Sequence, residues 1–315
     1  MRWRSFLFPK PKALVLRLAI LGSLLPILGW CGGSYWIFDL FNHFQWQYLC
    51  LLGVAFVTLL CMREWRFAAL ASLCLAIPLT RIGLGVVDSP CQPFPGGKPL
   101  RITSFNVLTA NTRYGDALSW IHKTMPDVIF LPEVDEEWAA QLRPLQGSHP
   151  YVVEHIVEGN FGFACYSKLP ILEQEIIPCG ELELPLLKLR LQGEGKTFVF
   201  FGAHPVPPGN EFWARERDVF LGIIAAQVEA QKDTVIVAGD MNATVWSQGM
   251  KPLKDAGLRG WEGIPTWSRE NPLLAVPIDH VLYRKDESSF IESSGYEVGP
   301  DLGSDHRPVT RDLVW

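Results

Sequence analysis

Residues 235–242 read Val-Ile-Val-Ala-Gly-Asp-Met-Asn, an apolar run that ends in a carboxylate and an amide. Apolar runs of this length that are rich in β-branched residues predict buried strands. Gly239 allows a sharp turn, and Asp240 and Asn242, two positions apart in extended chain, point the same way. A carboxylate can orient or deprotonate a water, and an amide can donate to a phosphate oxygen. The stretch therefore predicts a catalytic turn, with an ordinary capped turn as the alternative, since Asp and Asn are common in turns.

The same pattern recurs through the last two thirds of the chain, where polar residues follow apolar runs. The other residues of this kind are Asn106, Glu133, His204, the pair Asp279 and His280, and the pair Asp305 and His306. Each one alone has a structural reading, as a turn residue or a packed side chain. A polar residue just beyond a buried strand faces the crevice where an open sheet presents its ligand site. Taken together, they predict one assembled site and hence an enzyme.

Strand-like and helix-like segments alternate between these residues. The expected strands are 101–108, 127–131, 151–157, 161–167, 172–177, 186–191, 197–203, 234–238, 278–283, 290–298 and 308–313. The expected helices are 114–123, 136–142 and 211–229, and we expect Phe212, Val219, Ile223 and Ala226 to form the apolar stripe of the last one. This mixture predicts an α/β fold with two packed sheets and helices outside them.

The first 99 residues have a different composition. Their formal charge is +6, whereas the rest of the chain carries −11. Three apolar stretches, 13–32, 46–62 and 67–87, approach the roughly 20 residues that a membrane-spanning helix needs. A buried helical core is the alternative, and three such runs with so few charges argue against it. We expect a membrane anchor over 1–88, a Pro/Gly linker over 89–99 and a catalytic domain over 100–315.

Basic residues flank the predicted spans unevenly. Arg2, Arg4, Lys10 and Lys12 precede the first span, and Arg63 and Arg66 separate the second from the third, whereas the loop after the first span has no Lys or Arg. By the positive-inside rule, three spans then place the C-terminal domain outside the cytoplasm. An oxidising compartment permits one disulfide among Cys91, Cys165 and Cys179, for which Cys165 with Cys179 is one candidate pairing.

In order along 101–315, the motifs are strand-Asn, strand-Glu, His-Pro, Gly-Asp-x-Asn, Ile-Asp-His and Ser-Asp-His. This order resembles the endonuclease/exonuclease/phosphatase superfamily, which includes DNase I, exonuclease III and the neutral sphingomyelinases. The apolar N-terminal helices are similar to those of bacterial membrane-anchored members, which implies a multi-pass protein of the bacterial inner membrane. One departure is Pro132, where the family usually has Gln before the metal-binding Glu, and this puts neighbouring hydrogen bonds in question.

The resemblance implies a four-layered α/β sandwich and phosphoester hydrolysis that depends on Mg²⁺ or Mn²⁺. It assigns the metal to Glu133, with Asn106 and Asp305 close by. It implies that Asp240 orients or activates water and that Asn242 holds a phosphate oxygen. Charge on the phosphate would be stabilised by His204 and by His306 paired with Asp279. These roles meet the needs of the reaction, since a phosphodiester requires charge neutralisation, an aligned nucleophile and a stabilised leaving oxygen.

The substrate is less closely defined by the sequence. A domain of charge −11 without a Lys/Arg run argues against long nucleic acids, and anchoring beside a bilayer favours a lipid headgroup or another small phosphoester. A DNA or RNA nuclease is the alternative, and a non-catalytic binding module is a second one. We expect His280 to be structural. Arg113 and Tyr114 either contact substrate or lie in an exposed loop, and Trp267 either walls the pocket or packs as an ordinary aromatic residue.

Overall fold

The computed structural model describes residues 11–85, 99–193, 195–285 and 291–314. The chain divides into two compact units. A helical unit comprises Met1–Val86 and Trp246–Gln248, and a sheet unit comprises Val87–Val245 and Gly249–Trp315. The predicted linker 89–99 lies outside the described residues except for Pro99, which begins the first strand.

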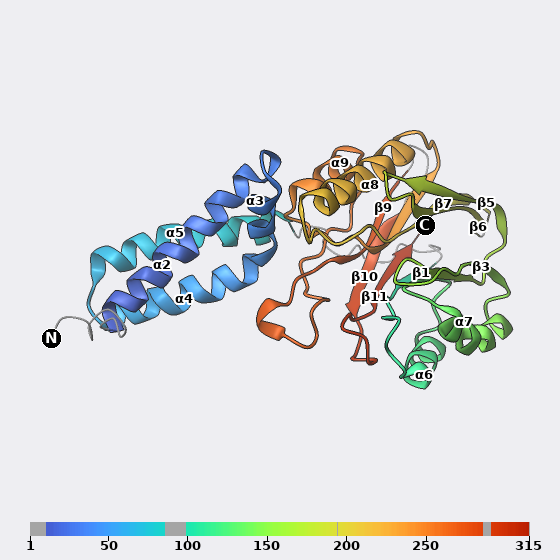
Figure 1. Cartoon of the computed structure of the whole chain (residues 1–315), viewed down its shortest axis with the longest axis horizontal. Coiled ribbons are helices and arrows are strands. Elements are labelled where there is room, and N and C mark those ends of the chain that lie inside the picture. Colours follow the sequence, from blue (N-terminus) through green and yellow to red (C-terminus); the bar gives the residue numbers. More distant parts are fainter. Residues whose placement is uncertain (1–10, 86–98, 194, 286–290, 315) are drawn as a thin grey trace. The chain divides into compact units, whose positions relative to one another are not determined.

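The helical unit contains α2 (Pro11–Gly29), α3 (Trp36–Leu40), α4 (Gln45–Cys61) and α5 (Trp65–Gly85), with 3₁₀ turns η1 (Trp30–Gly33) and η2 (Phe41–Phe44) between the first three (Figure 1). Within the described residues, three segments are long and apolar enough to cross a membrane: Ala13–Gly33, Trp36–Cys61 and Trp65–Gly83. Apolar side chains cover their outer surface as well, because Val54 and Leu73 are 68% and 71% exposed. Such helices suit lipid rather than water as their surroundings. The number and approximate positions of the predicted apolar helices are confirmed.

The described residues of the sheet unit form two mixed sheets. The first has the order β10-β11-β1-β2-β4-β3, built from β1 (Pro99–Ser104), β2 (Val128–Pro132), β3 (Tyr151–His155), β4 (Phe163–Ser167), β10 (Glu292–Val298) and β11 (Val309–Val314). The second has the order β5-β6-β7-β8-β9, built from β5 (Ile171–Cys179), β6 (Leu184–Gln192), β7 (Thr197–Ala203), β8 (Thr234–Asp240) and β9 (Asp279–Arg284). Each sheet has one parallel pair, β1 with β2 and β7 with β8.

Helices cover the outer face of each sheet (Figure 1). On the first sheet lie α6 (Tyr114–Thr124) and α7 (Glu136–Leu142), followed by η3 (Arg143–Gly147), and their Trp120, Ile121 and Trp138 pack against strand residues. On the second lie α8 (Glu211–Glu229) and α9 (Lys251–Asp255), preceded by η4 (Gln248–Met250). The inner faces of the two sheets share one core of aliphatic and aromatic residues. The predicted four-layered α/β sandwich is confirmed.

The two sheets approach each other closely where their central strands meet. A Cβ on Gly202 of β7 would lie 2.3 Å from the ring of Phe130 of β2. Only a residue without a side chain fits at this distance, so Gly202 allows Phe130 to pack against the facing sheet. This contact brings together the strands that carry the polar residues described below.

The predicted apolar stripe of the helix 211–229 is wrong in part. In α8, Phe212 and Val219 are 38% and 40% exposed, and the buried stripe instead contains Phe220, Leu221, Ile224, Ala225 and Val228. The helix has apolar residues on more than one face. Because Phe212 was assigned to the buried face, the predicted stripe was rotated away from the face that contacts the sheet.

The Cys165–Cys179 disulfide is not formed. Cys165 lies in β4 and Cys179 at the end of β5, in different sheets and different hydrophobic clusters, and both are free and buried. Cys91 lies outside the described residues. Each of these two thiols therefore serves as a small apolar core group.

Arg311 of β11 is a fully buried cation that ties the first sheet to the second. Its guanidinium donates to the Val281 carbonyl in β9 at 2.8 Å, to the Gly260 carbonyl at 2.8 Å and to Glu262 at 3.0 Å. It also donates to the Ser293 hydroxyl at 2.6 Å. A buried charge is tolerated when its hydrogen-bonding capacity is met in this way.

We predict that Arg311→Met lowers the free energy of unfolding of the sheet unit by about 3–5 kcal/mol, the usual cost of breaking a buried pair. The control is Arg101→Met, because Arg101 pairs with Asp312 at 2.6 Å with its side chain 40% exposed, and such pairs contribute about 1 kcal/mol or less. Urea unfolding of the full chain in detergent, followed by near-UV circular dichroism, compares the two. Equal losses would show that Arg311 does not hold the sheets together.

Candidate active site

Parallel strands bring the polar residues to one edge of the sandwich. Asn106 and Glu133 follow β1 and β2, while His204 follows β7 and Asp240 ends β8. Since neighbouring parallel strands end at the same edge, each sheet presents two of these side chains there. Asp279 begins β9 directly opposite Asp240 in the antiparallel ladder. His306 precedes β11, which runs antiparallel to β1, so it reaches the same edge from the other direction.

Asn106 connects the two sheets at this edge. Its Nδ2 donates to Glu133 Oε1 at 2.9 Å and to Asp240 Oδ2 at 3.2 Å, and its Oδ1 accepts from the Leu108 backbone at 3.1 Å. All three residues are buried, because the exposed fractions of Asn106, Glu133 and Asp240 are 0%, 8% and 2%. One amide thus sets the separation of two carboxylates that come from different sheets.

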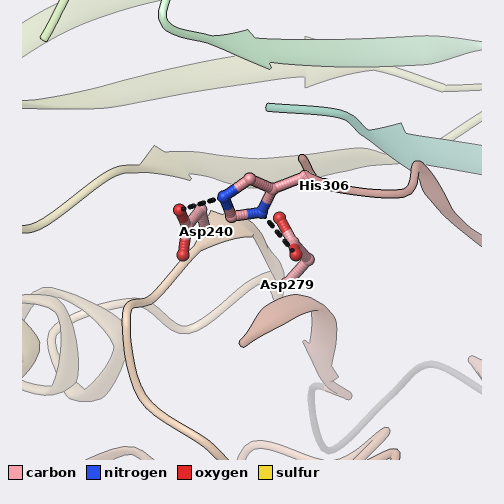
Figure 2. Close-up of side chains that lie close together, drawn as sticks. All are labelled: Asp240, Asp279 and His306. Atoms are coloured by element: carbon pink, nitrogen blue, oxygen red, sulfur yellow. Dashed lines mark hydrogen bonds and ion pairs between the residues drawn. The ribbon is translucent and has the colours of Figure 1, made fainter. Parts of the chain in front are cut away.

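His306 lies between two carboxylates, as Figure 2 shows. Its Nδ1 donates to Asp279 Oδ2 at 2.9 Å, and its Nε2 lies 3.6 Å from Asp240 Oδ2. Burial alone would lower the pKa of His306, but Asp279 and Asp240 raise it to about 10. Ser304 holds the backbone here, since its hydroxyl accepts from the His306 N–H at 3.0 Å and donates to the Asn106 carbonyl at 2.8 Å. The arrangement is that of an imidazolium between two carboxylates.

The other buried ionisable groups are shifted mainly by loss of water. Burial raises the pKa of Asp240 to about 7, against the opposing effect of His306, and it raises the pKa of Glu133 above its ordinary value. Burial lowers the pKa of His204 to about 4. The Nε2 of His204 lies 3.6 Å from Asp240 and 3.8 Å from Glu133. At neutral pH this edge therefore holds a neutral imidazole, His204, beside the charged one.

Two residues of the site have left-handed backbone. The φ angle is 63° at Glu133 and 46° at Asn242. Asn tolerates this region, but a Glu there is uncommon and costs of order 1 kcal/mol or more, and such residues concentrate at functional sites. Asn242 donates its side-chain amide to the Pro205 carbonyl at 2.9 Å and its backbone N–H to Asp240 Oδ1 at 2.9 Å. Its amide nitrogen carries a second hydrogen that can serve a ligand.

Asp305 also lies near His306, and its hydrogen-bond partner could not be identified from the sequence. Trp267 Nε1 donates to Asp305 Oδ2 at 2.8 Å, and the Trp267 ring lies 6.4 Å from the ring of His306. Asp305 Oδ1 is 4.0 Å from His306 Nε2. Trp267 was predicted either to wall the pocket or to pack as an ordinary aromatic residue. Its indole does both, because it packs near His306 and holds Asp305.

Two groups of residues at this edge suit a cation. Glu133 Oε2 and Asp305 Oδ1 are buried and have no hydrogen-bond partner within the described part of the chain, and carboxylate oxygens of this kind fit a hard ion such as Mg²⁺. Asp240, Asp279 and His306 also lie close enough together to hold a metal ion. His306 already donates to Asp279, however, and imidazolium does not bind metal, so the oxygens of Glu133 and Asp305 fit the ion better.

Three neighbouring residues lie away from this cluster. His280 is buried and bonds through Nε2 to the Ala243 carbonyl at 2.9 Å, as expected for a structural histidine. Arg113 is half exposed and pairs with Asp116 and Asp301. Tyr114 packs edge-on against Trp138, with 4.6 Å between ring centroids. For Arg113 and Tyr114, these contacts favour the reading as residues of a structured surface loop.

Comparison with known proteins gives one family. The sequence profile of the Endonuclease/Exonuclease/phosphatase family matches residues 103–306, and no curated protein matches the chain.

Solved structures match the fold at low identity. The structure of D. rerio TDP2 complexed with single strand DNA product is 21% identical, with a TM-score of 0.58 over 69% of this chain and 99% of that one. Sphingomyelinase C from Streptomyces griseocarneus is 18% identical, with a TM-score of 0.53 over 68% and 99%. An endonuclease/exonuclease/phosphatase from Beutenbergia cavernae is 20% identical, with a TM-score of 0.57 over 69% and 71%.

We predict that Asp279→Asn lowers the pKa of His306 by roughly one to three units, because an adjacent carboxylate stabilises the imidazolium by about that much. The measurement is an NMR titration of the ring nitrogens in histidine-labelled full chain, in detergent and with chelator present. Asp233→Asn is the control, since Asp233 pairs only at the surface with Arg190. A pKa of His306 that does not move would show that Asp279 does not hold its proton.

Proposed function

The chain belongs to the endonuclease/exonuclease/phosphatase family, and we propose that it is a membrane-associated, divalent-metal-dependent hydrolase of phosphoesters. The observation that carries the proposal is the Asp240–His306–Asp279 chain of contacts beside two buried carboxylate oxygens without a partner among the described residues. A metal site next to an aligned acid/base group is the combination that phosphoester hydrolysis needs.

Glu133 and Asp305 would hold the divalent ion, with Asn106 close by. The ion, when bound, would neutralise charge on the phosphate. Asn106 fixes the Glu133 carboxylate through its 2.9 Å hydrogen bond, and Trp267 fixes Asp305 at 2.8 Å. Each carboxylate thus has one oxygen held by the protein and the other left for a cation. Hydrogen bonds of this type orient ligands and keep their geometry.

Asp240 would align the attacking water and accept its proton. The pKa of Asp240, raised by burial to about 7, suits a general base at neutral pH. His306, held by Asp279, would stabilise negative charge that develops on the phosphate, and His204, whose Nε2 also lies 3.6 Å from Asp240, would donate to the phosphate as well. The free amide hydrogen of Asn242 would bind a phosphate oxygen. All of these groups are fixed before substrate binds, so little reorganisation accompanies the reaction.

A lipid headgroup or another small phosphoester is the substrate class that we favour. The part of the chain after residue 99 carries −11, which disfavours a long polyanion, and the apolar helices would keep the site near lipid. The alternative is a nuclease, which the likeness to a protein solved with a single strand DNA product keeps open. A non-catalytic binding module is the second alternative. It would have no need for the buried charges that this edge maintains.

We predict that Glu133→Gln weakens Mg²⁺ binding and lowers turnover, on the order of 10²-fold, the scale for removing an electrostatic group at an active site. Glu136→Gln is the matched control, since Glu136 is exposed in the first turn of α7. Calorimetric Mg²⁺ titration and turnover measurements test both variants. Normal turnover in Glu133→Gln would remove Glu133 from the site.

We further propose that the chain lies in a bacterial inner membrane with its sheet unit on the extracytoplasmic side. The basic flanks Arg63 and Arg66, between the second and third apolar helices, support this orientation by the positive-inside rule. A fluorescent reporter that matures only in the cytoplasm, fused after Trp315, should stay dark. Strong fluorescence would reverse the proposed topology.

A further inference from the structure

The segment between α9 and β9 ends in exposed apolar side chains. Leu273 is 82% exposed, more than any other large apolar side chain in the described residues, and its neighbour Leu274 is 50% exposed. Both lie in η5 (Pro272–Leu274). Water is an unfavourable environment for two adjacent Leu side chains, and contiguous exposed apolar side chains outside the apolar helices mark a contact surface.

This segment is a defined arm with a closed base. Trp267 and Val276 pair across it in an antiparallel bridge, so residues 268–275 form the tip. Figure 1 draws the arm in orange, extending away from both sheets. Ile264, just before the base, is also 45% exposed. The arm therefore presents its apolar side chains away from the core of the sheet unit.

The arm is hydrogen-bonded, through its base and through Arg269 of the tip, to the active-site segment that carries Asp305 and His306. The Arg269 N–H donates to the Asp305 carbonyl at 2.9 Å, and the Arg307 N–H donates to the Thr266 carbonyl at 3.0 Å. The Trp267 indole holds the Asp305 side chain. These hydrogen bonds connect the arm to Asp305, so the apolar tip and the active-site segment belong to one bonded unit.

We propose that this tip is a bilayer-contacting element, in which Leu273 and Leu274 enter the apolar edge of the membrane and bring a lipid phosphoester to the site. We choose the bilayer as the partner because the three apolar helices of the same chain would tether the tip to a membrane, which raises the effective concentration of lipid at the tip. The charges near the tip compensate one another, since Arg269 pairs with Glu270 and Asp301. The contact should therefore not require anionic lipid. The lipid-substrate part rests on the proposed function, whereas the bilayer contact does not.

The bilayer contact is tested with a polarity-sensitive fluorophore on Leu273→Cys in the full chain, reconstituted in phosphatidylcholine vesicles that contain acyl-chain nitroxide lipid. Native cysteines are replaced by Ser except Cys165 and Cys179, which are buried and do not label because burial raises the pKa of each thiol. The control is Leu172→Cys on the edge strand β5, where Leu172 is 51% exposed.

We expect emission from position 273 to shift to the blue and to be quenched by the nitroxide, with position 172 unaffected. Quenching should be the same when part of the phosphatidylcholine is replaced by phosphatidylglycerol. Unquenched emission at 273, or a shift that appears only as protein concentration rises, would overturn the proposal, the latter because a second copy would then cover the tip.

Substrate delivery is tested with Leu273→Ser/Leu274→Ser against Leu172→Ser. We expect the ratio of hydrolysis of vesicle phospholipid to hydrolysis of soluble bis(p-nitrophenyl) phosphate to fall about tenfold in the double variant only. An unchanged ratio would overturn the delivery role. If the unaltered chain hydrolyses neither ester, the proposed function fails, while the fluorophore still decides whether the tip contacts the bilayer.

Discussion

The two hydrogen bonds from Asn106 to Glu133 and Asp240 are the interaction on which the rest of the site depends. Carboxylates from two different sheets meet at one buried edge, and without a donor between them their repulsion and desolvation would force them apart. The amide supplies that donor. The close packing of the sheets, permitted by Gly202 beneath Phe130, sets the distance at which one amide can reach both.

Burial of charged groups at this edge costs folding free energy, and the same burial shifts their pKa values. Loss of water raises the pKa of Asp240 and lowers that of His204, while the carboxylates on either side keep His306 charged. The neutral imidazole of His204 and the charged imidazole of His306 thus each lie 3.6 Å from Asp240. A single exposed Asp or His would have none of these properties, so the proposed function depends on the folded sandwich more than on any one residue.

Much of this arrangement could be predicted from the sequence, because it follows from strand ends. Apolar runs that terminate in Asn106, Glu133, His204 and Asp240 predicted a common edge, and their order predicted the fold. Other features could not be read in this way. The Trp267–Asp305 hydrogen bond joins residues 38 positions apart, and the left-handed backbone at Glu133 has no sequence signal. The apolar stripe of α8 was misplaced because exposed Phe212 and buried Phe220 look alike in the sequence.

Hydrolysis by the purified full chain, in detergent or vesicles, tests the central claim most directly. The substrates are a bilayer phospholipid, a soluble phosphodiester and single-stranded DNA, each with Mg²⁺ and with EDTA. The account predicts turnover of at least one phosphoester with Mg²⁺, its loss in EDTA and its recovery when Mg²⁺ is restored. Binding without turnover of any of them, or hydrolysis that EDTA leaves unchanged, would contradict it.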